Sequence, residues 1–175
     1  PQPKEGQVLV EVHAASVNPV DYKIVLGNLK LLLRLKLPAV FGYDFAGVVV
    51  EKGVGVAHLE VGDSVYGRVP SESPCTFAEF VAVDAEIVSL KPKTLDFIEA
   101  SSIPLVGVTT VQVFNRSNLK FGDRVLIHAG SGGIGTFAIQ YAKAKGAYVF
   151  TTTSTQNVGW VKALGADRVI DYKKE

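Results

Sequence analysis

Methionine is absent from this sequence of 175 residues, and Cys75 is its single cysteine. One cysteine excludes a disulfide framework and a cysteine-rich zinc cluster, and it is typical of a reducing compartment, so we expect a cytoplasmic protein. Because the initiator methionine is missing, we expect the natural N-terminus, with any targeting peptide, to lie outside this sequence.

The sequence also lacks an excess of either charge. Its 18 basic and 17 acidic residues give a net charge of +1, and the pair Lys173 and Lys174 is too short to form a basic surface. We therefore expect no nucleic-acid partner. The apolar run 24–37 contains interspersed basic residues and is too short to cross a bilayer, so no transmembrane segment is expected. We interpret it as a surface helix or loop, with a membrane-surface stretch as the alternative.

The first part of the chain contains short β-rich runs separated by glycine and proline. These runs are residues 7–15, 45–51, 77–83 and 86–90, and residues 61–67 are predicted to form a turn that leads into a further short strand. Short strands punctuated in this way favour a small, partly open β-barrel. A helical pattern over residues 94–115, interrupted at Pro104, then leads into the second part. We place the two domains at residues 1–100 and 101–175.

A glycine cluster in the second part separates an apolar run from a helical pattern. Gly130, Gly132 and Gly135 fit G-x-G-x-x-G, in which the glycines allow a tight turn, close approach to a pyrophosphate and packing of the helix on the strand. The first helical turn, near Gly133 and Ile134, would present unpaired N–H groups to a phosphate. Glycine loops that only close a turn are the alternative, so the surrounding pattern decides.

That surrounding pattern alternates strands with helices. Strands are predicted over residues 125–129, 148–153 and 168–172, and helices that end at Gly146 and Gly165 lie between them. Strand, helix, strand, helix and strand at this spacing is half of a doubly wound nucleotide-binding sheet.

The same residues carry a family resemblance. The motif is Gly122-Asp123-x-x-Leu126, then Gly130-Ser131-Gly132-Gly133-x-Gly135, then Gln140-x-x-Lys143. It resembles the signature of the quinone oxidoreductase and zeta-crystallin branch of the medium-chain dehydrogenase/reductase superfamily. Residues 16–23 and 103–109 are similar to the early active-site segment and the interdomain helix of that branch. The resemblance implies a GroES-like catalytic domain followed by the first half of an NADP-binding Rossmann domain, apparently truncated.

Zinc enzymes of this superfamily carry a G-H-E-x-x-G segment, which this chain replaces at residues 42–47. Tyr43 stands in place of the histidine, and Asn18 lies where relatives have a ligand cysteine. Both are poor ligands for zinc, and His13, His58 and His128 are scattered. We therefore predict a metal-free enzyme. Without a Lewis acid to acidify a hydroxyl, reduction of an already polarised acceptor suits it better than alcohol oxidation.

Reduction of a quinone or an α,β-unsaturated carbonyl builds negative charge on oxygen, which hydrogen-bond donors can stabilise. Lys23, Tyr22 and Asn18 are available as donors. The resemblance implies that Lys23 matches a lysine that plant enone reductases use on the substrate carbonyl. The alternatives are a solvated surface charge for Lys23 and a core position for Tyr22. We predict Lys23 and Tyr22 as the catalytic residues.

The cofactor is predicted from the region after the second strand of the nucleotide-binding half. Residues 150–157 contain no acid that could grip both ribose hydroxyls, so NADPH is expected over NADH. The resemblance places Ser154 and Tyr172 at the 2′-phosphate, although Gln156 and Asn157 stand where relatives usually have a cation. The full set of predicted cofactor contacts is Asn18, Thr109, Gly130, Ser131, Gly132, Gly133, Ile134, Gly135, Ser154, Asn157 and Tyr172.

We therefore predict an NADPH-dependent reductase that acts on a small quinone or enone and forms a homodimer at full length. Residues 1–175 alone are expected to be inactive, because half of the nucleotide-binding sheet is missing. Two alternatives stay open. One is a non-enzymatic binding or structural protein similar to zeta-crystallin, which salt-sensitive RNA binding would favour. The other is an enoyl-reductase module of a larger synthase.

Overall fold

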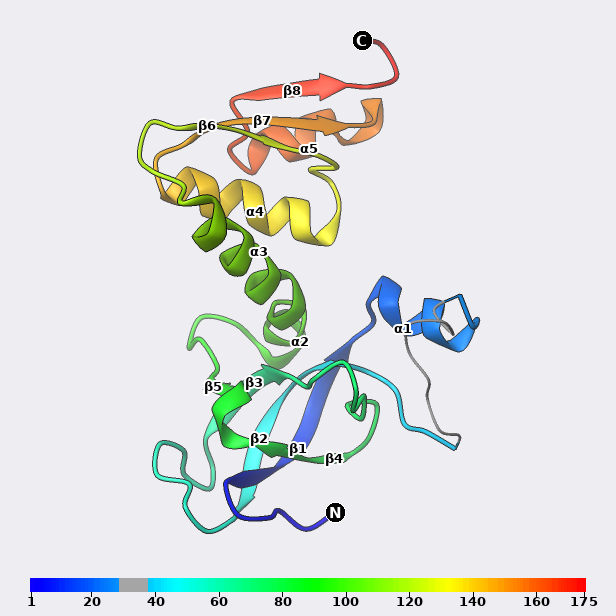
Figure 1. The fold of residues 1–175 in the computed structure, drawn as a ribbon, viewed down its shortest axis with the longest axis vertical. Helices are drawn as coiled ribbons and strands as arrows, with labels where there is room; N and C mark the ends of the chain where they lie inside the picture. The colour runs from blue at the N-terminus through cyan, green and yellow to red at the C-terminus, as the bar shows by residue number, and fades with distance from the viewer. Residues whose placement is uncertain (29–37) are drawn as a thin grey trace. The chain divides into compact units, whose positions relative to one another are not determined.

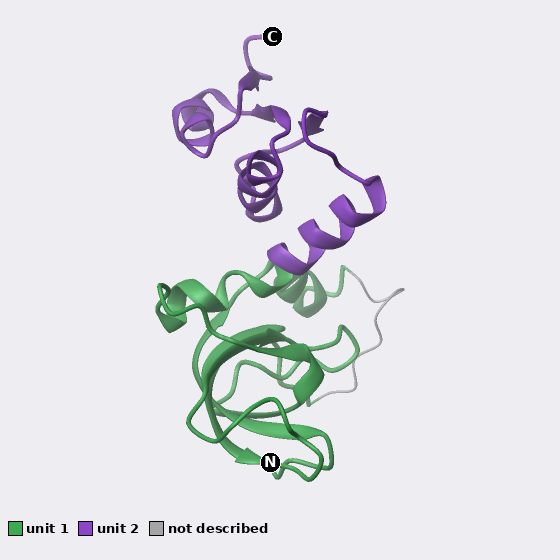
Figure 2. Cartoon of the chain, turned by 90° about the vertical axis from the view of Figure 1, so that its left-hand side faces the viewer, with its two compact units in different colours: residues 1–105 green, residues 106–175 purple. Residues whose placement is uncertain are grey.

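The computed structural model describes residues 1–28 and 38–175 of the chain (Figure 1). The chain divides into two compact units, residues 1–105 and 106–175, which Figure 2 shows in different colours. Each unit has a hydrophobic core of its own. Most of the apolar run 24–37, interpreted as a surface helix or loop, lies outside the described residues.

The first unit is built on a five-stranded antiparallel sheet with the strand order β4-β1-β2-β3-β5. Its strands are β1 (Gln7–Ser16), β2 (Asp44–Lys52), β3 (Ser64–Arg68), β4 (Phe80–Asp84) and β5 (Val88–Leu90). Within the described part of the chain, β4 and β5 end this order without pairing with each other. The predicted partly open arrangement of short strands is therefore confirmed.

Two of these strands begin later than predicted. The run 77–83 becomes a strand only at Phe80, because the Phe77 N–H donates to the Phe41 carbonyl at 2.9 Å and so belongs to a loop. The first residues of the run 86–90 belong to a short 3-10 turn, η1 (Ala85–Ile87), which leaves only three residues for β5. Both corrections arise from loop hydrogen bonds that the alternation of side chains does not reveal.

The core of the first unit follows from the alternation along its strands. Val8 and Val10 of β1 are fully buried and pack in one cluster with Phe45 and Val49 of β2. Tyr43, just before β2, joins this cluster, and its hydroxyl donates to the Ser71 carbonyl at 3.2 Å. A buried phenol with a hydrogen-bond partner is a packing residue.

Short helices flank this sheet. Helix α1 (Pro19–Val25) begins with proline at its first position, and Asp21 accepts a hydrogen bond of 2.6 Å from the Asn18 N–H. Helix α2 (Phe97–Ser101) begins with a reciprocal pair, in which Asp96 accepts from the Glu99 N–H and Glu99 accepts from the Asp96 N–H. These caps fix where each helix starts.

The second unit contains a three-stranded parallel sheet in the order β6-β7-β8. The elements are α3 (Pro104–Ser117, which begins just before the unit), β6 (Arg124–Ile127), α4 (Gly133–Ala144), β7 (Tyr148–Thr153), the turn η2 (Thr155–Asn157), α5 (Val158–Ala163) and β8 (Arg168–Asp171). The predicted alternation is confirmed. Strand β6 ends two residues before the predicted Ala129, because Ala129 has a left-handed φ of 57°.

Helices α4 and α5 lie on the same face of this sheet, as Figure 2 shows. The crossover from β6 to β7 and the one from β7 to β8 both move in the same direction along the sheet. Because crossovers between parallel strands are right-handed, the helices of both crossovers lie on the same face. Val149 and Thr151 of β7 are buried beneath them. On the opposite face Leu126 is 61% exposed and Tyr148 44% exposed.

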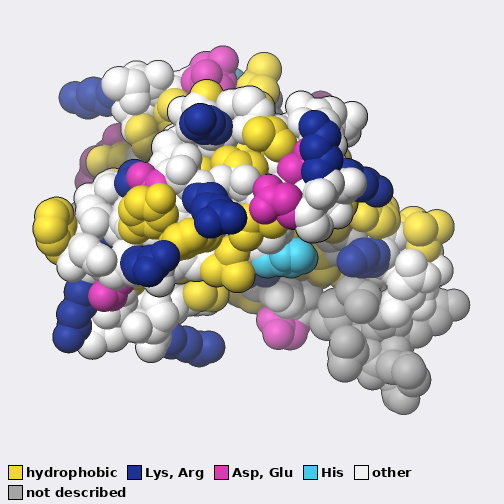
Figure 3. Space-filling model, turned by 90° about the horizontal axis from the view of Figure 1, so that it is seen from above, with side chains coloured by type: hydrophobic (Ala, Val, Ile, Leu, Met, Phe, Trp, Pro, Cys, Tyr) yellow, Lys and Arg dark blue, Asp and Glu magenta, His cyan; other side chains and the backbone are white. Residues whose placement is uncertain are grey.

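The face of the molecule that Figure 3 shows is mixed in character. In the view of Figure 3, hydrophobic side chains are exposed among basic and acidic ones, without a continuous basic area. Within residues 1–28 and 38–175, none of the helices has the length and apolar character needed to cross a bilayer.

Candidate cofactor and active site

The glycine loop connects β6 to α4, and two of its glycines are needed for packing. Gly130 is buried, and a Cβ added there would collide with the Thr151 hydroxyl of β7. A Cβ added at Gly135 would collide with the Ala129 carbonyl. Any larger side chain would therefore push α4 away from the sheet or open the turn.

The start of α4 leaves backbone donors available to a ligand. The N-cap residue is Gly132, which has no side chain to cap the helix. Gly133, Ile134 and Gly135 form the first turn of the helix. The backbone N–H groups of a first turn have no acceptor within the helix. Ile134 is 45% exposed, so this end of the helix is open to solvent. These residues fit the phosphates of a dinucleotide at the positive end of the helix dipole.

Hydroxyl groups of β7 fasten the glycine loop, a role that sequence reasoning missed. The Thr153 hydroxyl donates to the Ser131 hydroxyl at 2.9 Å. The Thr152 hydroxyl accepts from the Ala129 N–H at 3.0 Å and lies 2.9 Å from His128 Nδ1. The run of threonines in residues 151–153 is the available signal, but the sequence predicts from it only a strand and the absence of an acid that would select NADH.

The ends of β7 and β8 bring three of the predicted cofactor contacts into one region. Asn157 Nδ2 donates to the Ser154 hydroxyl at 3.3 Å. The Tyr172 N–H donates to the Thr153 carbonyl at 3.2 Å, so Tyr172 and Ser154 follow neighbouring strand ends. Lys173, which the sequence analysis did not assign, places its Nζ 5.6 Å from the centre of the Tyr172 ring. A cation is therefore present beside one of these neutral groups, the Tyr172 side chain.

In the first unit, Asn18 belongs to a hydrogen-bonded group with Ser16 and Asp44. Asn18 Nδ2 donates to Asp44 Oδ2 at 3.0 Å and to Ser16 Oγ at 3.3 Å, and the Ser16 hydroxyl donates to Asp44 Oδ2 at 3.1 Å. Asp44 is fully buried. Its burial raises the pKa of the carboxyl, and hydrogen bonds from Asn18 and Ser16 offset only part of this rise.

Sequence reasoning noted Asp44 only as part of the segment that lacks a histidine. The signal that could have found its role was a carboxylate at the start of the apolar strand β2, because a buried charge needs partners.

The two predicted catalytic residues lie on α1 and are exposed. Tyr22 is 49% exposed, so the alternative core position for this side chain is wrong. Lys23 is also exposed and lies in the last turn of the helix. Thr109 is partly buried in α3, which belongs mainly to the second unit. Tyr22 and Lys23 therefore lie on the helix that Asn18 caps, whereas Thr109 lies on a different helix, α3.

The residues that replace the family's zinc ligands do not fit a metal. The Tyr43 hydroxyl is engaged with a backbone carbonyl, and the Asn18 amide faces Asp44 with its nitrogen. Among the described residues, no group of three His, Cys, Asp or Glu side chains is arranged to hold a metal ion. The donor set is also wrong for zinc, which prefers thiolate, imidazole and carboxylate ligands.

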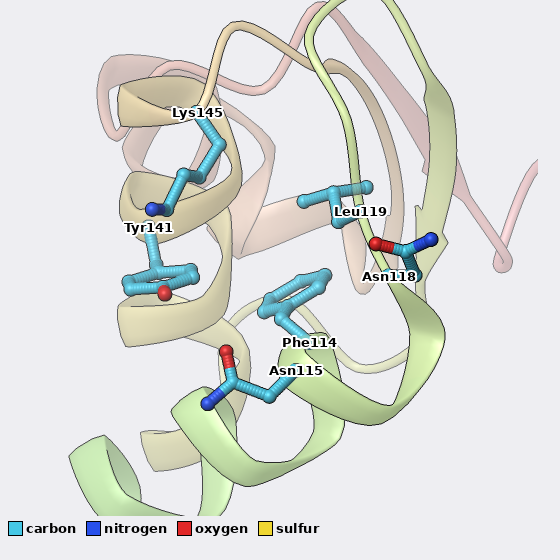
Figure 4. A pocket seen from close by; sticks show the side chains of 6 residues that line it. All are labelled: Phe114, Asn115, Asn118, Leu119, Tyr141 and Lys145. Carbon is cyan, nitrogen blue, oxygen red and sulfur yellow. The ribbon is translucent and has the colours of Figure 1, made fainter.

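A pocket in the second unit lies away from the glycine loop (Figure 4). It is lined by Phe114, Asn115, Asn118, Leu119, Tyr141 and Lys145. The Phe114 and Tyr141 rings stack with their centres 5.5 Å apart, and Lys145 directly follows the last residue of α4. Because the glycine loop meets the first residue of α4, this pocket is at the opposite end of the helix.

Both units match known domain families. Residues 4–93 match the alcohol dehydrogenase GroES-like domain, and residues 133–175 match the zinc-binding dehydrogenase domain. This combination defines the class of chain: a GroES-like unit precedes part of a Rossmann-like unit, the domain order of the alcohol dehydrogenase families that match.

Relatives similar in sequence indicate a narrower group within these domain families. The chain is 42% identical to 2-methylene-furan-3-one reductase of Solanum lycopersicum and 43% identical to the chloroplastic NADPH-dependent alkenal/one oxidoreductase of Arabidopsis thaliana, covering 100% of this chain and 47% of each relative. The solved quinone oxidoreductase of Coxiella burnetii is 43% identical, with a TM-score of 0.87 over 100% of this chain and 56% of its own. The chain belongs to the medium-chain dehydrogenase/reductase family, in its quinone oxidoreductase branch. It spans about half the length of the curated relatives it matches.

Proposed function

We propose that this chain is part of an NADPH-dependent reductase that transfers hydride to a quinone or an α,β-unsaturated carbonyl without a metal. The observation that carries the proposal is the glycine loop, where Gly130 and Gly135 pack without room for a Cβ while the first turn of α4 remains uncapped. The printed names of the relatives, an alkenal/one oxidoreductase and a quinone oxidoreductase, support the substrate class.

The residues at the ends of β7 and β8 support NADPH as the cofactor. Ser154, Asn157 and Tyr172 offer neutral hydrogen-bonding groups for a 2′-phosphate, and Lys173 adds a positive charge near the Tyr172 ring. A charge-assisted hydrogen bond is about twice as strong as a neutral one, so Lys173 offsets the missing cation at residues 156 and 157. Strand β7 ends in threonines rather than in the acid that selects NADH.

The chemistry asks little of the protein beyond orientation and charge stabilisation. When bound, NADPH supplies the hydride, and an enone accepts it at the β-carbon while negative charge develops on the carbonyl oxygen. A proton then reaches the α-carbon, so one C=C bond is reduced. Lys23 and Tyr22 are exposed N–H and O–H donors on α1 that could stabilise the developing oxyanion.

The proposal is tested with the full-length protein, because this chain spans about half of its relatives. NADPH consumption is followed with a panel of quinones, alkenals and enones. In a separate assay, NADPH formation is followed with simple alcohols and NADP⁺. We expect turnover with at least one electron-poor acceptor and none with alcohols. Lys23→Ala should lower kcat/KM for that acceptor by about 10², the scale of one lost oxyanion donor. Failure of every acceptor would contradict the proposed function.

Two further properties belong to the same proposal. We infer a homodimer and a cytoplasmic location for the full-length protein, the location resting on the single Cys75. The relative in Arabidopsis is chloroplastic by name, so the location needs a direct measurement. Light scattering of the purified protein tests the dimer, and imaging of the tagged full-length protein tests the location.

A further inference from the structure

Asp171 is the last residue of β8, and only 7% of it is exposed. It pairs in register with Thr153, the last residue of β7, whose hydroxyl bonds to Ser131 of the glycine loop. The two strands are parallel, so their carboxyl ends lie side by side (Figure 1). Ligands of open α/β sheets bind at this end of the strands. A buried carboxylate therefore lies at the edge of the second unit where a nucleotide is expected.

The Asp171 carboxylate joins two segments that follow different strands. Asp171 Oδ1 accepts a hydrogen bond of 3.1 Å from the Thr155 hydroxyl, in the turn after β7, and another of 3.1 Å from the Lys173 N–H, in the turn after β8. The bond from Lys173 is local, and aspartates often close turns in this way. The bond from Thr155 crosses 16 positions of the chain and is not needed for that turn. One carboxylate oxygen thus fixes the two turns relative to each other.

These two turns carry the groups proposed for the 2′-phosphate. Ser154 and Asn157 lie on either side of Thr155 and are joined by a hydrogen bond of 3.3 Å. Tyr172 and Lys173 directly follow Asp171. A hydrogen-bond donor must lie about 2.7 to 3.2 Å from its acceptor, so a site shared by two turns needs a fixed spacing between them. The double hydrogen bond to Asp171 supplies that constraint.

An acid near a phosphate site is unfavourable unless its charge is offset, because like charges repel. Lys174 provides the offset, since its Nζ lies 3.9 Å from Asp171 Oδ2. Within residues 1–28 and 38–175, Lys173 forms no ion pair with an acid. The two lysines therefore differ in role: Lys174 screens Asp171, and the Lys173 ammonium remains available to a phosphate.

We propose that Asp171 is a positioning residue that sets the preference for NADPH over NADH, by holding the Thr155 turn and the Lys173 turn at the spacing that a 2′-phosphate requires. This inference rests on the proposed function for the identity of the cofactor. It requires the Asp171 oxygen as a hydrogen-bond acceptor and not its negative charge. Asp171 acts through its neighbours and is not itself assigned a contact with the cofactor.

The first test needs no cofactor and observes the Lys173 N–H in the full-length protein by NMR hydrogen exchange. Because Asp171 accepts this N–H, its proton should exchange about tenfold more slowly than that of an unprotected amide. Asp171→Ala should remove the protection. Asp171→Asn should keep most of it, since an amide carbonyl oxygen accepts the same hydrogen bonds. A Lys173 amide that is unprotected in the wild type overturns the proposal.

The second test compares two cofactors that differ only in the 2′-phosphate. Calorimetric titration of the full-length protein gives the affinities for NADPH and NADH. Asp171→Ala should weaken NADPH by about fivefold to tenfold, the scale of one neutral hydrogen bond, and NADH by less than about twofold. Asp171→Asn should keep the wild-type ratio within about twofold, because both bonds to the carboxyl oxygen are retained. A residue needed only for folding would move both affinities together.

Asp123→Ala is the matched control. Asp123 Oδ2 accepts from the Lys120 N–H at 2.7 Å in the turn before β6, so it is also an aspartate that closes a turn of the second unit. It lies at the amino end of the sheet, away from the strand ends that carry the proposed site. Its replacement should leave the ratio of the two affinities unchanged, and a narrowing equal to that of Asp171→Ala overturns the proposal.

The outcomes distinguish this inference from the proposed function. Wild-type protein that binds neither cofactor contradicts both. Wild-type protein that prefers NADPH, with an unchanged ratio in Asp171→Ala, overturns only the positioning role. Equal narrowing in Asp171→Asn and Asp171→Ala also overturns it, because the effect then comes from the charge. Should Asp171→Ala fail to fold, Thr155→Val removes only the bond between the two turns. It should narrow the ratio by about threefold, and an unchanged ratio overturns the proposal.

Discussion

The Thr153 hydroxyl donates a hydrogen bond of 2.9 Å to the Ser131 hydroxyl, which joins the end of β7 to the glycine loop. Thr153 is buried, so its hydroxyl has no access to water as a substitute. Thr153→Val keeps the shape and removes the bond. We expect the free energy of unfolding to fall by about 1 kcal/mol and NADPH binding to weaken a fewfold. Urea unfolding and calorimetry of the full-length protein measure both, and unchanged values would show that this bond is dispensable.

The packing of Gly130 predicts a large effect from a single methyl group. In Gly130→Ala the new Cβ would collide with the Thr151 hydroxyl. We therefore expect the free energy of unfolding to fall by about 2 kcal/mol or more, and nucleotide binding to be lost. Gly159→Ala in α5 is the matched control, because a Cβ there meets nothing within 4 Å. An exposed helical glycine replaced by alanine should stabilise the protein by up to about 1 kcal/mol. Equal behaviour of the two variants in thermal unfolding would contradict the account of the loop.

Much of the second unit could be predicted from the sequence because its constraints are local. Gly130 and Gly135 are visible as glycines, and the apolar runs on either side have the right periods for strand and helix. The early end of β6 could not be predicted, since nothing in the side chain of Ala129 announces a left-handed φ of 57°.

The candidate active site was less accessible to sequence reasoning. The pairing of Asn18 with Asp44 joins residues 26 positions apart, and such a hydrogen bond leaves no periodic trace in the sequence. Lys173 was dismissed as part of a short charge pair, because its proximity to the Tyr172 ring appears only after β8 has been placed.

Asp167 should make stability depend on pH at the acidic end. The Val149 N–H at 2.6 Å, together with the Lys143 ammonium at 2.9 Å, lowers the pKa of the Asp167 carboxyl. A carboxyl whose pKa is lower in the folded than in the unfolded state adds to the free energy of unfolding. This contribution is fully present above the unfolded-state pKa of aspartate, about 4, and is lost as the pH falls through the folded-state pKa. Asp167→Asn should therefore be less stable than wild type at pH 7, with a difference that shrinks in acid.

Urea unfolding of both proteins across this pH range measures the effect. Glu175→Gln is the control, because its exposed pair with Arg168 spans 3.9 Å and should contribute less than about 0.5 kcal/mol. A stability difference for Asp167→Asn that stays constant as the pH falls would contradict the assignment.

Charge beside the 2′-phosphate region should set the choice of cofactor. We expect the full-length protein to prefer NADPH over NADH by about tenfold, since one or two neutral hydrogen bonds are worth about 1 to 2 kcal/mol. Asn157→Lys should widen this ratio and Lys173→Ala should narrow it, both mainly through the affinity for NADPH. Lys162→Ala, which removes an exposed cation from α5, is the control. Equal affinity for NADH in the wild type would contradict the assignment of Ser154 and Tyr172.

The transfer of hydride from cofactor to carbon is the central claim, and isotope labelling tests it most directly. Full-length protein is supplied with an enone and with NADPH that carries deuterium at one or the other C4 position of the nicotinamide. The account predicts that one of the two labelled cofactors gives a saturated product with a single deuterium at the β-carbon, while the α-carbon takes hydrogen from solvent. Mass spectrometry and NMR of the product locate the label. A reduced product without deuterium at the β-carbon from either cofactor would contradict the account.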